Sequence, residues 1–194
     1  MQQSGRTSSV IAKESLLLHT CCGPCLTVVY EQLQTEGFDV TAFFYNPNIH
    51  PWKERDRRLC TLSEYADSEN IPLEIDDEYP LEENIRMLLY AENRCLACFE
   101  DRLRATAFKA AELGIENFST TLSVSPYQNQ TLIMEAGNAA SRESGVRFIY
   151  RDFREFFRES MRISREAEMY SQPYCGCVFS ERDRYLKLKS PGQV

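Results

Sequence analysis

Residues 15–33, SLLLHTCCGPCLTVVYEQL, combine the signals for a strand, a turn and a helix in immediate succession. The compact apolar run from Ser15 to Thr20 predicts a short buried strand. Pro24 favours the first turn of a helix, and the helical pattern from Leu26 to Leu33 stops near Gly37. Because Val40 to Tyr45 predicts a second strand, this part of the chain forms a strand–helix–strand crossover, whose natural product is a parallel pair.

The alternation of helices and strands continues through the rest of the chain. Residues 46–51 hold two prolines and two asparagines, which predict a turn. The order of elements predicts an α/β fold of the Rossmann-like (HUP-like) type: a doubly wound, mostly parallel sheet with helices on both faces. Sites in such sheets gather at the carboxyl ends of the strands. The remaining predicted elements are helices at 52–70, 81–90, 95–113, 130–144 and 154–170, and strands at 71–75, 118–123 and 146–153.

The length and composition predict a single domain in a cytoplasmic protein. A chain of 194 residues has the usual size of one domain. We expect residues 15–189 to form this domain, residues 1–14 to be a disordered polar segment and residues 190–194 to be a flexible tail. No apolar run is long enough for a signal peptide or a membrane span. In the cytoplasm most thiols stay reduced, which argues against a framework of structural disulfides.

The formal net charge of −7 argues against indiscriminate binding of nucleic acid through a strongly basic surface. Local basic faces are still present in two parts of the chain. They could contact phosphate groups, but the favoured interpretation is ordinary solvated faces with nearby glutamates as partners. The first group is Arg147, Arg151, Arg154, Arg158, Arg162 and Arg165, and the second is Lys53, Arg55, Arg57 and Arg58.

Seven of the eight cysteines fall into three tight groups. Such spacing is typical of ligands to zinc or to an iron–sulfur cluster, or of a redox-active dithiol. Cys60 stands alone, outside the apolar face of its predicted helix, and is interpreted as an incidental thiol. The three groups are Cys21, Cys22 and Cys25; Cys95 and Cys98; and Cys175 and Cys177.

The first group lies between a predicted strand and a predicted helix. The positive end of the helix dipole lowers the pKa of thiols placed there and favours thiolates. The tetrapeptide from Cys22 to Cys25 is also that of thioredoxin-type redox sites, so a dithiol oxidoreductase is one alternative. Cys95 and Cys98 share one face at the start of a helix and, if isolated, could simply be small buried hydrophobic residues. Together with Cys21 and Cys22 they complete a set of four thiolates.

Four thiolates could hold either zinc or a [4Fe-4S] cluster. The third group favours iron, because a disulfide across Cys175 and Cys177 would close a very short loop and would be strained and easily reduced. A labile dithiol implies electron transfer, which zinc does not perform. The two histidines, His19 and His50, are candidate proton donors or additional ligands, although structural roles in a turn or strand are as well supported.

Six motifs together match a known family. The chain resembles the cobalamin-independent epoxyqueuosine reductases over nearly all of Leu16 to Ser180, and the ordered combination is far more specific than any single motif. Only the termini and Cys60 fall outside the pattern. The motifs are HTCCGPC at 19–25, YNPNIHP at 45–51, RCLAC at 94–98, TTL at 120–122, SPY at 125–127 and YCGC at 174–177.

The resemblance implies the last step of queuosine synthesis, in which the epoxide oxygen of epoxyqueuosine at the wobble position of transfer RNA is removed reductively. It implies that Cys175 and Cys177 are the redox-active pair, in a metal-binding catalytic domain. It also implies a single iron beside the cluster, for which Cys25 is a candidate ligand together with the redox pair. The partners implied are the anticodon loop of transfer RNA and an unidentified electron donor. The implied ligands of the [4Fe-4S] cluster are Cys21, Cys22, Cys95 and Cys98.

Opening an epoxide to an alkene consumes two electrons and two protons, whereas a [4Fe-4S] cluster ordinarily passes one electron at a time, so a second centre is needed. The iron or the dithiol could supply it, and His19, His50 or a water could deliver protons. A zinc-stabilised RNA-binding module without catalysis is the competing hypothesis from another class. A sulfur-transfer enzyme acting on transfer RNA is less favoured, because no Ser-Gly-Gly motif for binding ATP follows the first strand.

Overall fold

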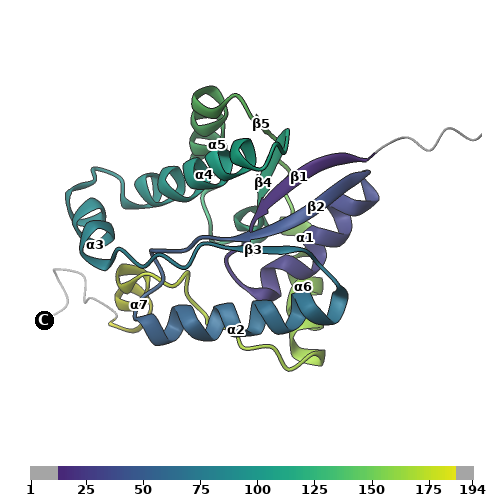
Figure 1. Cartoon of the computed structure of the whole chain (residues 1–194). Helices are drawn as coiled ribbons and strands as arrows, with labels where there is room; N and C mark the ends of the chain where they lie inside the picture. The colour runs from purple at the N-terminus through teal and green to yellow at the C-terminus, as the bar shows by residue number, and fades with distance from the viewer. Residues whose placement is uncertain (1–12, 187–194) are drawn as a thin grey trace, which may run out of the picture.

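The structure, a computed structural model, describes residues 13–186. Five parallel strands form one sheet in the order β3-β2-β1-β4-β5 (Figure 1). This order is that of the Rossmann fold, so the predicted doubly wound α/β architecture in a single domain is confirmed. The predicted N-terminal segment and C-terminal tail lie, but for residues 13 and 14, outside the described residues. The strands are β1 (Glu14–His19), β2 (Phe38–Phe44), β3 (Leu73–Ile75), β4 (Asn117–Thr120) and β5 (Arg147–Phe148).

Helices cover both faces of the sheet (Figure 1). On β1, Leu16 and Leu18 point into a core shared with α1 and α2, whereas Leu17 points into a second core built with α4 and α5. Alternating side chains of a strand point to opposite faces, so an unbroken apolar run is required where both faces are covered. The helices are α1 (Gly23–Thr35), α2 (Trp52–Glu69), α3 (Leu81–Tyr90), α4 (Arg94–Glu112), α5 (Gln130–Ser144), α6 (Phe157–Glu166) and α7 (Val178–Tyr185).

In the second half of the chain, three predicted elements are shorter than expected. The strand predicted at 118–123 ends at Thr120, whose hydroxyl accepts a hydrogen bond from the N–H of Leu122 and starts a 3₁₀ turn at 121–124. The strand predicted at 146–153 keeps only two residues, and the helix predicted at 154–170 becomes a 3₁₀ turn at 154–156 followed by α6. The chain leaves α6 through Glu168, which has a positive φ of 52°.

One helix, α7, was not anticipated from the sequence. It begins directly after Cys177, whose Sγ accepts a hydrogen bond from the N–H of Ser180, 3.3 Å away. Thiols are weak acceptors and are not among the residues that ordinarily signal a helix start, so the capping position was not recognisable.

Candidate metal and redox site

The site lies where β1 and β4 end side by side. The sheet order reverses between these two strands, and ligands of doubly wound sheets bind in the crevice at such a point. After β1 the chain enters α1 through Cys21 and Cys22, and Cys22 occupies the N-cap position with extended backbone. After β4 it enters the 3₁₀ turn through Thr121, whose hydroxyl accepts from the N–H of Cys21 at 3.3 Å and lies 3.6 Å from its Sγ.

Cys21, Cys22 and Cys25 form a compact group of thiols. Their Sγ atoms all lie within 4.8 Å of one another, with 3.7 Å between Cys21 and Cys22 and 3.1 Å between Cys22 and Cys25. Three soft sulfur donors at one point are the donor set that zinc and iron–sulfur clusters prefer. The residues present therefore fit a thiolate-bound metal centre.

The three thiols share negative charge unequally. Hydrogen bonds from Cys22 and Cys25 hold the pKa of Cys21 well below its usual value. Hydrogen bonding to Cys21 raises the pKa of Cys22 to about 12. Hydrogen bonds with Cys21 and Cys22 raise the pKa of Cys25. A thiolate at Cys21 stabilised by two protonated neighbours follows from this arrangement. The pKa is thus lowered at one of the three sulfurs, and the cause is hydrogen bonding from the neighbouring thiols rather than the helix dipole invoked from the sequence.

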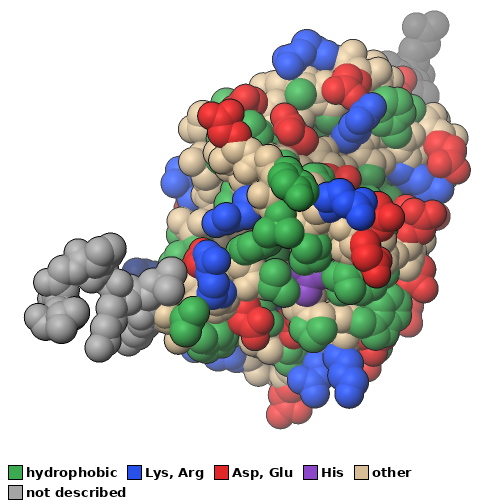
Figure 2. All heavy atoms as spheres, turned by 90° about the vertical axis from the view of Figure 1, so that its left-hand side faces the viewer, with side chains coloured by type: hydrophobic (Ala, Val, Ile, Leu, Met, Phe, Trp, Pro, Cys, Tyr) green, Lys and Arg blue, Asp and Glu red, His purple; other side chains and the backbone are tan. Residues whose placement is uncertain are grey.

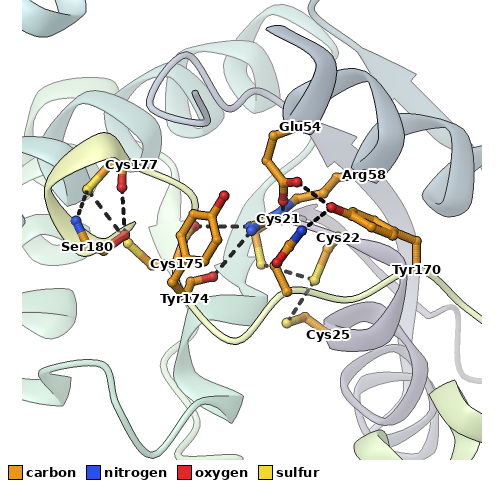
Figure 3. Close-up of polar contacts among 11 residues, drawn as sticks. Cys21, Cys22, Cys25, Glu54, Arg58, Tyr170, Tyr174, Cys175, Cys177 and Ser180 are labelled. Carbon is orange, nitrogen blue, oxygen red and sulfur yellow. Dashed lines mark hydrogen bonds and ion pairs between the residues drawn. The ribbon is translucent and has the colours of Figure 1, made fainter. Parts of the chain in front are cut away.

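The redox pair predicted at Cys175 and Cys177 forms a loop that lies beside the triad (Figure 3). The two Sγ atoms are 3.9 Å apart and both are free thiols, so no disulfide joins them. A hydrogen bond from Cys177 lowers the pKa of Cys175 to about 5, and the same contact raises the pKa of Cys177. Cys175 is exposed, as a thiol that exchanges with a partner must be.

Cys95 and Cys98 lie in the first two turns of α4, outside the compact triad. Burial raises the pKa of Cys98 to about 11, and it also raises that of Cys95, with a further contribution from the charge of Cys175. Arg102 links these groups. It is 4% exposed, and its Nε donates to the carbonyl of Cys98 at 3.1 Å.

Arg102 was not identified from the sequence. Burial alone would lower its pKa, but the charges of Cys98, Cys21 and Cys175 raise it above the usual value. One buried guanidinium is therefore close enough to respond to the charge of members of three cysteine groups, and it bonds directly to the backbone of one of them. The signal that could have found it is its spacing, one helical turn after Cys98.

Both histidines are buried next to the site. His19 ends β1, and its Nδ1 lies 2.9 Å from the hydroxyl of Thr120, while its Nε2 has no partner within the described chain. Burial and then the charge of Arg102 lower the pKa of His19 to about 3. Burial also lowers the pKa of His50, which follows β2. Neutral imidazoles donate or accept single hydrogen bonds, but they carry no readily available extra proton at neutral pH.

The two groups of basic residues identified from the sequence differ in their burial and in their partners. Arg55 and Arg58 are buried on α2, 0% and 6% exposed, so they belong neither to a solvated face nor to a phosphate-binding one. Four members of the other group form ion pairs with carboxylates, as expected for a solvated face: Arg147 with Glu14, Arg151 with Glu36, Arg154 with Asp152, and Arg162 with Glu159 and Glu166.

Cys60 is exposed on α2, outside the site. Within residues 13–186, the structure contains no helix of the length and apolarity that a bilayer span requires.

Fold and site together define a Rossmann-like α/β protein with a cysteine centre able to hold a metal. A family model described as Epoxyqueuosine reductase QueH matches residues 16–183. The chain belongs to this family, as its motifs predicted.

Curated relatives named Epoxyqueuosine reductase QueH resemble nearly the whole chain. The protein of Dehalococcoides mccartyi is 37% identical over 91% of this chain and 97% of its own length. The protein of Acinetobacter baylyi is 37% identical over 93% and 86%, and that of Thermotoga maritima is 33% identical over 89% and 93%.

Among solved structures, the U34-tRNA thiolase NcsA from Methanococcus maripaludis with its [4Fe-4S] cluster has a similar fold. The TM-score is 0.55 at 12% identity, and the match covers 86% of this chain and 61% of the thiolase. At this level of identity the likeness concerns the fold alone.

Proposed function

We propose that this protein reduces epoxyqueuosine to queuosine in transfer RNA, in keeping with its membership of the epoxyqueuosine reductase family. The observation that carries the proposal is a pair of adjacent sulfur sites. A compact group of three thiols fit to hold a metal sits at the switch point of the sheet, and an exposed dithiol lies beside it. The reaction needs electrons delivered in pairs to a bound substrate, and this arrangement provides both a metal site and a two-electron donor.

The metal centre is proposed to be a [4Fe-4S] cluster with a second iron beside it. Cys21, Cys22, Cys95 and Cys98 would be the cluster ligands, and Cys25 is the candidate for the second iron. The fold is compatible with such a cluster, since the thiolase of similar fold is described with one. When bound, the cluster would supply single electrons and the iron would supply Lewis acidity.

Oxidation of the dithiol would supply the electrons that removal of the epoxide oxygen consumes. Removing the epoxide oxygen breaks two C–O bonds, forms one C=C bond and releases water, which takes two electrons and two protons. Because Cys175 is a thiolate near neutral pH, oxidation of Cys175 and Cys177 to a disulfide releases two electrons and the one proton of Cys177, and water supplies the second proton. An external reductant of the thiol or low-potential electron-carrier class then restores the two thiols. The low pKa of Cys175 supports a nucleophilic or electron-donating thiolate at this position.

The two histidines are proposed to orient the substrate rather than to act as cationic acids. Each is neutral near pH 7, because burial lowers its pKa. A neutral His19 can donate one N–H or accept one hydrogen bond through Nε2, which fits a hydroxyl of the substrate. Protons would then come from the dithiol or from water.

Recognition of RNA is proposed to use the face on which α3 and α7 lie. Hydrophobic side chains gather in the middle of this face, with a histidine visible among them and Lys and Arg side chains around them (Figure 2). Trp52, 44% exposed, packs edge-on against Tyr79, with ring centroids 5.2 Å apart. Aromatic rings of this kind stack unpaired bases of RNA loops, and flanking arginines contact phosphates.

The proposal is tested by turnover under anaerobic conditions. The purified protein is incubated with a reductant and transfer RNA carrying epoxyqueuosine, and the nucleosides are then analysed by mass spectrometry. We expect loss of one oxygen atom from the modified nucleoside, together with iron and sulfide in the protein. A colourless protein that carries only zinc and leaves the epoxide intact would instead support the RNA-binding module.

A further inference from the structure

The loop that carries the dithiol is held by its backbone. Three consecutive carbonyl groups, those of Tyr174, Cys175 and Gly176, accept hydrogen bonds from α2 and the turn before it. Arg58 donates from Nη2 to the first at 3.2 Å and from Nη1 to the second at 3.0 Å. The N–H of His50 donates to the third at 2.9 Å. This capture leaves the side chains of the loop free for chemistry.

Arg58 is itself fixed by a buried ion pair. Its Nε donates to Oε1 of Glu54 at 2.6 Å, and the two side chains are 7% and 6% exposed. The hydroxyl of Tyr170 donates to the other oxygen of the same carboxylate (Figure 3). A buried ion pair is weak evidence for stability, because apolar residues of similar volume often serve as well. Here the ion pair orients the guanidinium so that Nη1 and Nη2 of Arg58 point at the carbonyl groups of the loop.

The guanidinium also faces the metal-binding triad. Burial alone would lower the pKa of Arg58, but the charges of Cys22, Glu54 and Cys21 raise it above the usual value. The same side chain thus holds the dithiol loop through hydrogen bonds on the side of the loop that lies toward the triad (Figure 3). Among the residues described, Arg58 is the side chain of α2 that donates hydrogen bonds to that loop.

Gly176 allows the loop to approach this closely. Its φ is +114°, and a Cβ built there would lie 3.0 Å from Cγ1 of Ile49 and 3.1 Å from Nη1 of Arg58. A side chain would push the loop away from the arginine. The glycine between the two cysteines therefore serves the docking of the loop as well as its short turn.

We infer that Arg58 is a positioning residue, which docks the Cys175–Cys177 loop against the cysteine triad so that the dithiol can deliver electrons there. The inference rests on the proposed function and adds to it a residue that sets the geometry of electron delivery. Electron or group transfer between two sites is sensitive to displacements of about 1 Å, so an undocked loop would slow turnover without changing how RNA binds.

Three variants test the role of Arg58. Arg58→Met removes the donors, and Arg58→Lys keeps the charge and one carbonyl contact. The double variant Glu54→Gln with Arg58→Met avoids leaving a buried carboxylate unpaired, so it separates loss of docking from failure to fold. Arg142→Met, an exposed arginine on α5, is the matched control. Amide hydrogen exchange is measured for residues 170–178 and for the turn at residues 46–51, which contains His50. Thermal unfolding and the kcat and KM for the transfer RNA are measured as well.

We expect exchange in both segments to rise about tenfold or more in the two methionine variants, with an intermediate rise in Arg58→Lys. We expect kcat to fall about 10- to 100-fold with KM for RNA within about twofold of the wild type, and lysine to rescue part of the loss. Unchanged exchange in the folded double variant would overturn the inference, as would normal kcat despite increased exchange. An inactive wild type would refute the proposed function, whereas the exchange data would still decide whether Arg58 docks the loop.

Discussion

The Sγ atom of Cys22 lies 3.1 Å from the Sγ atom of Cys25, across the first turn of α1. This spacing lets one helix start present two thiols to a single centre, with Cys21 as the third. Hydrogen bonding to Cys21, followed by burial, raises the pKa of Cys22 and Cys25 and keeps these two thiols protonated without a metal. Metal binding must therefore release protons, and retention of metal should weaken as pH falls.

Replacing a member of the triad should remove the metal. For Cys22→Ser and Cys25→Ser, we expect the affinity for iron to fall by at least the roughly 10- to 100-fold that loss of a supporting group costs at metal sites. Iron and sulfide are measured after anaerobic purification, together with the visible absorbance. Cys60→Ser, which removes an exposed thiol on α2, is the control and should retain full iron. Equal iron content in all variants would contradict the assignment of the triad.

The dithiol should be needed for turnover but not for the metal. Cys175→Ser and Cys177→Ser are expected to keep the iron content and absorbance of the wild type and to lose multiple turnover. The physical reason is that a single thiol has no partner with which to form a disulfide and so cannot release two electrons. Turnover is followed as the number of epoxides reduced per protein. Full activity in either variant would show that the two sulfurs have no redox role.

Alkylation of Cys175 should report its low pKa. Because the thiolate is the reacting form, the rate with iodoacetamide should be on a plateau above pH about 6 and fall roughly tenfold per unit below about 5. In Cys177→Ala the hydrogen bond is lost, so the midpoint should move upward toward the usual value near 9. The rates are measured by mass spectrometry of the reduced protein. An identical pH profile in both proteins would exclude the hydrogen bond as the cause.

Gly137 provides a test of the fold, because the packing around it decides whether Gly137→Ala raises or lowers the free energy of unfolding. Alanine would stabilise an unhindered helix by about 1 kcal/mol relative to glycine. A Cβ at position 137, however, would overlap the ring of Phe148 on β5. We therefore expect Gly137→Ala to lower the free energy of unfolding by about 1–3 kcal/mol in urea titrations. Asn138→Ala, exposed on the same helix, should change it by less than about 0.7 kcal/mol. Stabilisation by Gly137→Ala would refute this packing of α5 on β5.

The sheet could be predicted because its evidence is local. The apolar run from Leu16 to Leu18 predicts a strand that is buried on both faces of the sheet. The thiols follow this strand directly, so they lie at the carboxyl end of the sheet, where binding sites form. The end of β4 was placed too late because the hydroxyl of Thr120 caps the next turn. This side-chain hydrogen bond competes with continuation of the strand, and the pattern of apolar residues gives no sign of it.

The role of Arg58 could not be predicted for a different reason. Glu54 and Arg58 have the spacing of an ordinary surface pair, and only the return of the chain at Tyr170 to Tyr174 buries them. Such long-range closure leaves no local sequence signal. The sequence also proposed four thiolates from two groups, whereas the compact group in the structure is the triad, so the cluster ligands remain a prediction for the iron analysis above.

Arg102 should set the reduction potential of the metal centre. Reduction adds negative charge, and a buried cation near the sulfurs favours the reduced state. Arg102→Met keeps much of the packing against Phe99 but removes the charge, so we expect the midpoint potential to become more negative by tens of millivolts. The measurement is a redox titration followed by visible absorbance. Arg104→Met, an exposed residue of the same helix paired with Glu143, is the control and should leave the potential unchanged. An unchanged potential in Arg102→Met would mean that the guanidinium only holds the carbonyl of Cys98.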